Sequence, residues 1–144
     1  MDYMLREEQL GQTEFTIEAM QHVHHRKTGA IMQAALKLGG MIADASERQL
    51  AALEEFGKHF GLAFQITDDL LDVLGNEETV GKRLRKDADM AKWSYPHFLG
   101  IEASKQAAVK AVSNAEKALA IFEQEAVPLQ ALRDWVRRLP DRVF

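Results

Sequence analysis

The chain has 144 residues, a length that predicts one domain, residues 1–144, with its own hydrophobic core. A formal charge of −4 gives no reason to expect nucleic acid or an anionic membrane as the main partner, and the absence of cysteine excludes disulfides and thiolate metal sites. No apolar run reaches the roughly 20 residues that span a bilayer, and the N-terminus lacks the layout of a secretory signal, so we expect a cytoplasmic protein.

The first half of the chain has the apolar periodicity of two long helices. Thr16 is placed to cap a helix over residues 17–43, and Ser46 to cap a second over residues 47–74. Gly75 and Asn76 suggest the end of the second helix, because both tolerate the left-handed conformation found past helix ends. The apolar stripe of the first helix consists of Met20, Val23, Ile31, Ala34, Ala35, Leu38 and Ile42.

The second half is predicted to hold a loop and three further helical stretches. Residues 76–90 are polar without an apolar period, which is typical of a mobile loop. Helices are expected from Tyr95, over residues 101–125, and after Pro128, where Trp135 is expected in the core. No strand or repeat is indicated, so we predict an all-α fold.

Residues 64–72, FQITDDLLD, place three carboxylates within five positions of an otherwise apolar run. At roughly 100° per residue, Gln65, Asp68, Asp69 and Asp72 share one polar stripe of the helix. The helix is predicted to bury the other side, an aliphatic face made of Leu62, Ile66, Leu70, Val73 and Leu74. Like charges at this spacing destabilise a helix by a few tenths of a kcal/mol, about 0.2–0.5 for each pair. Oxygen-rich sites of this kind suit Mg²⁺ that is shared with substrate phosphates. The pattern favours magnesium held against a diphosphate, and the alternative is a solvated acidic face.

Two basic groups could supply the cations that a diphosphate requires. The first, HHRKTG, includes Lys27 followed by Thr28 and Gly29. The second, GKRLRKDADMAKWSYP, includes Lys82 and Lys92. Lysine binds phosphate as a flexible point charge, and a mobile loop suits a lid over a ligand. The alternative for both groups is a solvated basic patch.

Taken together, KTG, FQxxDDxLD and GK…KD…KxSYP resemble the C-terminal half of the trans-isoprenyl diphosphate synthases. This is the polyprenyl synthetase family, which includes farnesyl and geranylgeranyl diphosphate synthases, and the short bacterial enzymes look most similar. The resemblance implies a helical bundle of the isoprenoid (terpenoid) synthase type, of which this chain corresponds to the C-terminal half.

The resemblance also implies roles for individual residues. The implied Mg²⁺ ligands are Asp68, Asp69 and Asp72. The implied substrate-binding residues are Lys27, Thr28, Phe64, Gln65, Lys82 and Lys92. A catalytic role is implied for Lys27, Asp68, Lys82 and Lys92.

The reaction implied by the family condenses an allylic diphosphate with isopentenyl diphosphate. The allylic diphosphate ionises, the carbocation alkylates the double bond of isopentenyl diphosphate, and proton loss gives the product. Metal ions and lysines stabilise the leaving diphosphate by their charge, and the departing pyrophosphate can accept the proton.

The match to the family is incomplete. Residues 1–66 contain no first aspartate-rich motif and none of the residues that hold isopentenyl diphosphate, and Arg85 and Ala91 stand where the family has glycines. We therefore expect negligible condensation by this chain alone, and either a homodimer or a partner that supplies the missing half.

Several other interpretations remain open. The chain could be a truncated fragment, a non-catalytic subunit that stabilises a synthase, or an unrelated helical bundle whose acidic stripe binds a cation. A further hypothesis is a metal site among the histidines, of which His22 and His25 have helical i, i+3 spacing; the others are His24 and His59. The alternative is a solvated or partly buried polar face.

Overall fold

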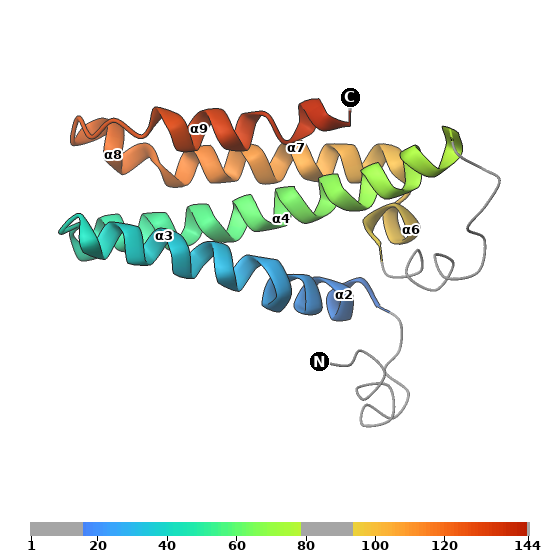
Figure 1. Ribbon diagram of the computed structural model, residues 1–144, viewed down its shortest axis with the longest axis horizontal. Coiled ribbons are helices and arrows are strands. Elements are labelled where there is room, and N and C mark those ends of the chain that lie inside the picture. Colours follow the sequence, from blue (N-terminus) through green and yellow to red (C-terminus); the bar gives the residue numbers. More distant parts are fainter. Residues whose placement is uncertain (1–15, 79–93, 144) are drawn as a thin grey trace, which may run out of the picture.

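A computed structural model describes residues 16–78 and 94–143, and every regular element within these ranges is a helix (Figure 1). The all-α prediction is therefore confirmed for the described residues. The first helical run comprises α2 (Ile17–His24), the π-helical turn η1 (His25–Gly29) and α3 (Ala30–Ile42). It is followed by α4 (Glu47–Glu78), α6 (Tyr95–Leu99), α7 (Ile101–Ala118), α8 (Ala120–Gln124), α9 (Gln130–Arg137) and the 3-10 turn η2 (Pro140–Arg142).

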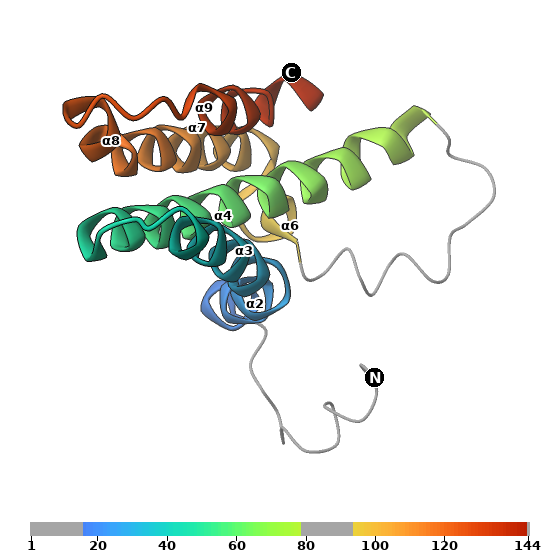
Figure 2. The same cartoon turned by 60° about the vertical axis from the view of Figure 1, so that its left-hand side comes forward.

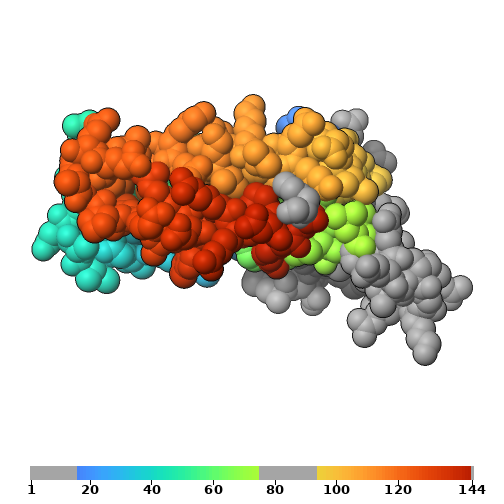
Figure 3. Space-filling view, turned by 90° about the horizontal axis from the view of Figure 1, so that it is seen from above, coloured from blue at the N-terminus to red at the C-terminus, as the bar shows by residue number. Residues whose placement is uncertain are grey.

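Helix α4 lies at the centre of the arrangement. The run α2–η1–α3 packs along one side of it, and α7 packs along the other (Figures 1 and 2). Helices α7 and α9 together cover the face seen from above in Figure 3. In the described part of the chain, no helix combines the length and apolar character required to cross a membrane.

Both predicted N-caps are present. The hydroxyl of Thr16 accepts a hydrogen bond from the Ala19 amide at 3.2 Å. The Ser46 amide donates to Gln49 Oε1 at 2.8 Å, and the Gln49 amide donates to Ser46 Oγ at 3.3 Å. This reciprocal pair is a capping box, which fixes the start of α4.

The reversal between α3 and α4 is a compact helix C-cap. Asp44 has a φ of 53°, and the Ala45 amide donates to the Gly40 carbonyl at 2.9 Å. The Asp44 amide donates to the Met41 carbonyl at 3.2 Å. This Schellman pattern satisfies carbonyls at the end of the helix and turns the chain back along α3.

Helix α4 is longer than the sequence predicted. It continues to Glu78, so Gly75, Asn76 and the first residues of the predicted loop are helical. Glycine and asparagine permit a left-handed helix end but do not require one. The rest of the predicted loop lies outside the described residues.

The single helix predicted over residues 101–125 is interrupted at Leu119, which separates α7 from α8. No proline or glycine marks this position. Leu119 is fully buried, and its carbonyl accepts a hydrogen bond from Arg133 Nη2 at 3.2 Å. The arginine of α9 thus satisfies a carbonyl at the break, a long-range interaction that local sequence does not reveal.

The prediction that Trp135 lies in the core is wrong. Its side chain is 64% exposed, whereas the next residue, Val136, is fully buried. Val136 and Leu139 are buried and Leu132 is half-buried, at the three- and four-residue spacing of one helix face. Trp135 lies outside that face.

The core forms two clusters along α4. One cluster joins α4 to α7, α8 and α9 and is centred on residues such as Phe56, Leu119 and Phe122. The other lies toward α2 and α6 and comprises Met20, Ile66, Leu70, Tyr95 and Ala108. Ile66 and Leu70 belong to the predicted aliphatic face of α4, opposite the aspartates, and their burial confirms it.

The helical run crosses α4 in direct backbone contact at Gly29 and Gly61. A Cβ atom added to Gly61 would lie 2.9 Å from the Gly29 Cα, and one added to Gly57 would lie 2.9 Å from the Gln33 Cα. Side chains at these positions would force the two helices apart. The glycines therefore set the spacing between η1 and α4.

Helix α3 is apolar on two sides. Its inner side faces α4 through Gln33, Leu36 and Gly40. Its outer side exposes large apolar side chains: Ile31 at 66%, Leu38 at 58%, Met41 at 56% and Ile42 at 84%. A helix that is apolar on both sides is typical of a buried element, so this face is suited to being covered.

We predict that Gly61→Ala destabilises the protein by about 1–3 kcal/mol, because its Cβ meets the backbone of Gly29. Gly39→Ala is the matched control, because a Cβ there meets nothing within 4 Å and should stabilise the helix by about 0.5–1 kcal/mol. Urea unfolding measures both. Equal stability of the Gly61→Ala variant and wild type would contradict the close crossing.

Candidate functional site

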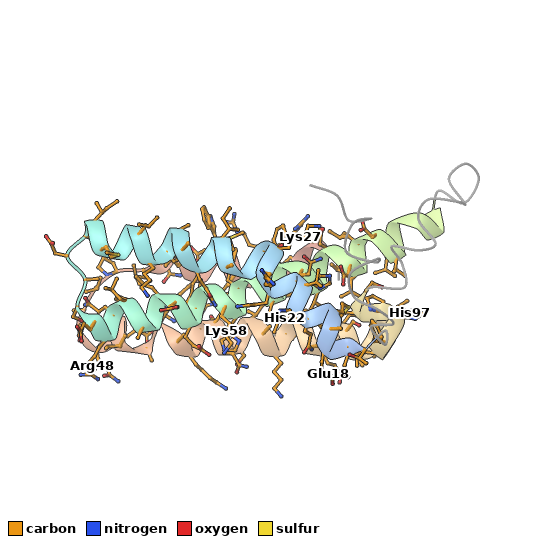
Figure 4. The ribbon with its side chains drawn as sticks, turned by 90° about the horizontal axis from the view of Figure 1, so that it is seen from below. Glu18, His22, Lys27, Arg48, Lys58 and His97 are labelled. Carbon is orange, nitrogen blue, oxygen red and sulfur yellow. The ribbon has the colours of Figure 1, made fainter. Side chains whose placement is uncertain are left out.

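The π-helical turn η1 carries the first of the predicted motifs. Residues 25–29, HRKTG, insert this turn between α2 and α3, and such turns occur frequently at functional sites. Lys27 is exposed, and Figure 4 shows it where η1 passes α4. Thr28 is half-buried and Gly29 is buried against Gly61. The crossing therefore holds Thr28 beside α4 while Lys27 stays accessible.

The two predicted motifs meet through a hydrogen bond between Thr28 and Gln65. Thr28 Oγ1 donates to Gln65 Oε1 at 3.3 Å, across 37 residues of sequence. Gln65 lies one helical turn beyond Gly61, so the close backbone crossing brings its amide within reach of Thr28. The structure thus brings together two of the residues that the sequence assigned to substrate binding.

Gln65 also contacts the aspartate cluster. Its Nε2 donates to Asp69 Oδ1 at 2.9 Å. The other carboxylate oxygen, Oδ2, accepts a hydrogen bond from the backbone amide of Tyr95 at 2.9 Å. A continuous path of hydrogen bonds therefore runs from Thr28 through Gln65 and Asp69 to the start of α6.

Asp69 is an unusual carboxylate because it is only 8% exposed. Burial raises its pKa to about 6, since desolvation disfavours the charged form. The hydrogen bonds from Tyr95 and Gln65 act in the opposite direction, and the neighbouring charges of Asp68 and Asp72 raise the pKa further. Near neutral pH the carboxylate is charged and held by two donors.

Asp68 is half-buried and Asp72 is exposed, four residues apart on the same helix. In the described part of the chain, no group of three or more histidine, aspartate or glutamate side chains is placed to hold a metal ion. Magnesium commonly uses only one or two carboxylates together with substrate phosphates and water. The oxygen donors of Asp68 and Asp72 fit that requirement, and Mg²⁺ binding by the cluster stays a prediction.

Phe64, to which the resemblance assigns substrate binding, packs partly into the core, and its contact with substrate stays a prediction. Its half-buried ring packs against the core cluster that α4 forms with α7, α8 and α9. The guanidinium carbon of Arg142 lies 5.7 Å from the ring centroid, within the range of a cation–π contact. The structure does not bring Phe64 together with Lys27 or Thr28 in any described contact.

Lys82 and Lys92 lie outside the described residues, so their predicted contacts with substrate stay predictions. The same holds for the rest of the basic segment between them. Of the predicted site, the structure describes Lys27, Thr28 and residues 64–72.

Two further residues, Tyr95 and His24, lie near the site. The Tyr95 amide binds Asp69, and the ring of His24 lies 6.0 Å from the Tyr95 ring, measured between centroids. His24 Nδ1 is buried without a hydrogen-bond partner. Burial, followed by the charge of Lys27, lowers the pKa of His24 to about 4. The sequence marked Tyr95 as a helix start and as part of the KxSYP motif, and His24 as part of HHRKTG, but none of these signals identifies the partner of either residue.

Comparison with known proteins assigns this sequence to a family. The family model described as Polyprenyl synthetase matches residues 1–127. The chain belongs to the polyprenyl synthetase family. Its all-α fold and the juxtaposition of the Lys-Thr pair with the aspartate-rich helix are thus features of a family member.

Individual relatives agree with this assignment. The chain is 36% identical over 126 residues to a geranylgeranyl diphosphate synthase of Cyanophora paradoxa, covering 88% of this chain and 42% of the relative. It is 38% identical over 120 residues to a dimethylallyltranstransferase of Fischerella ambigua, covering 83% and 35%. A farnesyl diphosphate synthase of Escherichia coli is 36% identical over 124 residues, with coverage of 83% and 42%. The matched region is therefore less than half of each relative.

We predict that His24 makes folding sensitive to acid. In the folded chain its pKa is about 4 and in the unfolded chain about 6.5, so only the unfolded chain takes up this proton between those values. The His24 contribution to the free energy of unfolding therefore falls as pH decreases from 6.5 to 4.

Asp69 changes the free energy of unfolding in the opposite direction over a similar range of pH. Its pKa is raised to about 6 in the folded chain, so protonation below pH 6 favours the folded state. His24→Phe removes the destabilising contribution and leaves that of Asp69. Urea unfolding at pH 7 and 4.5 should show the variant gaining stability relative to wild type at the lower pH. An identical difference in stability between the variant and wild type at both pH values would contradict the lowered pKa of His24.

Proposed function

We propose that this chain forms the magnesium- and diphosphate-binding half-site of a polyprenyl diphosphate synthase. The observation that carries the proposal is the contact between Thr28 of the Lys-Thr pair and Gln65 of the aspartate-rich helix. It joins a basic turn to an acidic helix face, and a metal-bound diphosphate requires both. The printed names of the relatives, which include geranylgeranyl and farnesyl diphosphate synthases, support this class of substrate.

In this proposal Lys27 places its ammonium group on the diphosphate, and Thr28 lines the same end of the site. Asp68 and Asp72 are the carboxylates that would hold Mg²⁺, and Asp69 is the third residue of that motif. Bound Mg²⁺ supplies positive charge that stabilises the leaving diphosphate. Lys82 and Lys92 are proposed as further cations around the same group.

The proposed reaction condenses an allylic diphosphate with isopentenyl diphosphate. The bond between the allylic carbon and the diphosphate oxygen breaks, with both electrons leaving on the diphosphate. The double bond of isopentenyl diphosphate attacks the resulting cation, and a proton is then lost to the pyrophosphate. Lys27 contributes to the first step by its charge, which becomes more favourable as negative charge develops on the leaving group.

The second half of the active site would come from another polypeptide segment. This sequence holds one aspartate-rich motif, and the chain spans 35–42% of the three relatives described. The uncovered apolar face of α3 continues from Lys27, because Ile31 lies one helical turn further along the helix. We propose that a helical segment equivalent to the unmatched part of these relatives covers this face and completes the site.

A second candidate function is that of a non-catalytic subunit that stabilises a synthase. The same exposed face of α3 favours it, because docking there requires no chemistry from the aspartates. The two candidates differ in whether Lys27 and Asp68 matter for activity of the assembled protein.

We predict that the pure chain does not catalyse condensation, because it lacks the first aspartate-rich motif and the contacts for isopentenyl diphosphate. Co-expression with the unmatched segment of the E. coli relative should give a complex that purifies together and condenses the two diphosphates. Measurable condensation by the pure chain would contradict the half-site proposal.

Variants on two exposed faces locate the docking surface. Leu38→Glu places a charge on the outer face of α3 and should abolish co-purification. Val109→Glu, at a 50% exposed position of α7, is the matched control and should leave the complex intact. Equal loss in both variants, or in neither, would show that α3 is not the docking face. Lys27→Ala in an intact complex should remove activity if the chain is catalytic and leave it unchanged if the chain only stabilises a synthase.

A further inference from the structure

We infer that Asp69 is a positioning residue, which ties α6 to α4 and orients Gln65 on Thr28, and that it is not a ligand of Mg²⁺. The anchoring of α6 and the orientation of Gln65 are independent of the proposed function. The statement that Asp69 is not a Mg²⁺ ligand rests on the proposed function.

The first argument is that protein groups already engage both oxygens of the carboxylate. Oδ1 accepts from Gln65 Nε2 and Oδ2 accepts from the Tyr95 amide, each at 2.9 Å. Only 8% of the residue is exposed. Each oxygen keeps a second lone pair, but a hydrated Mg²⁺ ion could reach it only if the packing around this buried carboxylate opened. The two charge-assisted hydrogen bonds hold the carboxylate in its buried position.

The second argument is the direction in which the three carboxylates lie. On α4, Asp72 is about 40° from Asp68, whereas Asp69 is about 100° from it. Burial also sets Asp69 apart, because Asp72 is exposed and Asp68 is half-buried, whereas Asp69 is buried. Within the described ranges no three acidic or histidine side chains converge on a common metal position. Asp68 and Asp72 thus lie on the more accessible side of the acidic stripe, and Asp69 lies on its buried side.

The third argument is what Asp69 holds in place. Tyr95 is the first residue of α6, where backbone amides have no partner within the helix. The Asp69 carboxylate satisfies this amide from another helix, and its charge suits a helix N-terminus. Tyr95 is itself 2% exposed and belongs to the core cluster of Met20, Ile66 and Leu70. Asp69 therefore anchors α6 at the aspartate-rich end of α4.

Asp69 also determines how the Gln65 amide is oriented. A charged carboxylate only accepts hydrogen bonds, so Nε2 of Gln65 faces Asp69 and Oε1 faces Thr28. Thr28 must then donate its hydroxyl proton to Gln65. Through this relay, a residue with no role in binding the ligand would fix the direction of a hydroxyl in the site.

Asp69→Asn and Asp69→Ala distinguish a positioning role of Asp69 from a role as Mg²⁺ ligand. Asparagine keeps the size of the side chain, and its oxygen can accept a hydrogen bond from the Tyr95 amide. Its NH₂ group can donate to Gln65 if the Gln65 amide rotates by half a turn. Thr28 tolerates this rotation, because a hydroxyl can either donate or accept. Alanine removes every contact. Asp68→Ala and Asp68→Asn are the matched controls at the neighbouring carboxylate.

The first measurement is amide hydrogen exchange of residues 94–99 in the 144-residue chain without ligand. We expect exchange to be about tenfold faster or more in Asp69→Ala, and close to wild type in Asp69→Asn and Asp68→Ala. Unchanged exchange in Asp69→Ala, or equal acceleration in Asp68→Ala, would overturn the anchoring role.

The second measurement is calorimetric titration with inorganic pyrophosphate, with and without MgCl₂. We expect Mg²⁺-dependent affinity to be lost in Asp68→Asn, to be weakened in Asp69→Ala, and to stay within about threefold of wild type in Asp69→Asn. A loss in Asp69→Asn as large as that in Asp68→Asn would show that Asp69 is a ligand and overturn the inference. If wild type itself binds no pyrophosphate, the proposed function fails, and the exchange measurement alone decides the positioning role.

Discussion

The candidate site depends on the backbone contact between Gly29 and Gly61. Because neither residue has a side chain, η1 approaches α4 closely enough for the Thr28 hydroxyl to reach Gln65. One turn further along α4 the same helix face carries the aspartates, so a shift at the crossing would move the basic turn away from them. The close packing of α3 on α4 and the placement of Lys27 follow from this single constraint.

Two features near the site, the acidic cluster of α4 and the exposed apolar face of α3, lower the stability of the fold. Three aspartates within five positions repel one another, and burial of Asp69 adds a desolvation cost that its two hydrogen bonds offset only in part. Helix α3 exposes large apolar side chains that water disfavours. Burial of Asp69 serves the fold, because its carboxylate anchors α6. The repulsion within the acidic cluster and the exposed face of α3 bring no such benefit, and both are accounted for if Asp68 and Asp72 bind a metal-bound diphosphate and a further helical segment covers α3.

Features that depend on neighbouring residues could be predicted from the sequence. Thr16 and Ser46 cap helices as their residue types suggest, and the period of apolar residues gave the buried side of α4 at Ile66 and Leu70. The break at Leu119 and the exposure of Trp135 could not be predicted from the sequence, because both depend on how α9 packs. The same holds within the site, because the spacing that grouped Asp69 with Asp68 and Asp72 could not reveal its hydrogen bond with the Tyr95 amide, 26 residues away.

The central claim is that the crossing of η1 and α4 forms a working half-site for a metal-bound diphosphate. Its most direct test is calorimetric titration of a non-hydrolysable allylic diphosphate analogue into the wild-type chain and Asp68→Ala, with and without Mg²⁺. The account predicts binding that requires Mg²⁺ and disappears in the variant. Absence of binding to a folded wild-type chain, or binding that is indifferent to Mg²⁺ and Asp68, would contradict it.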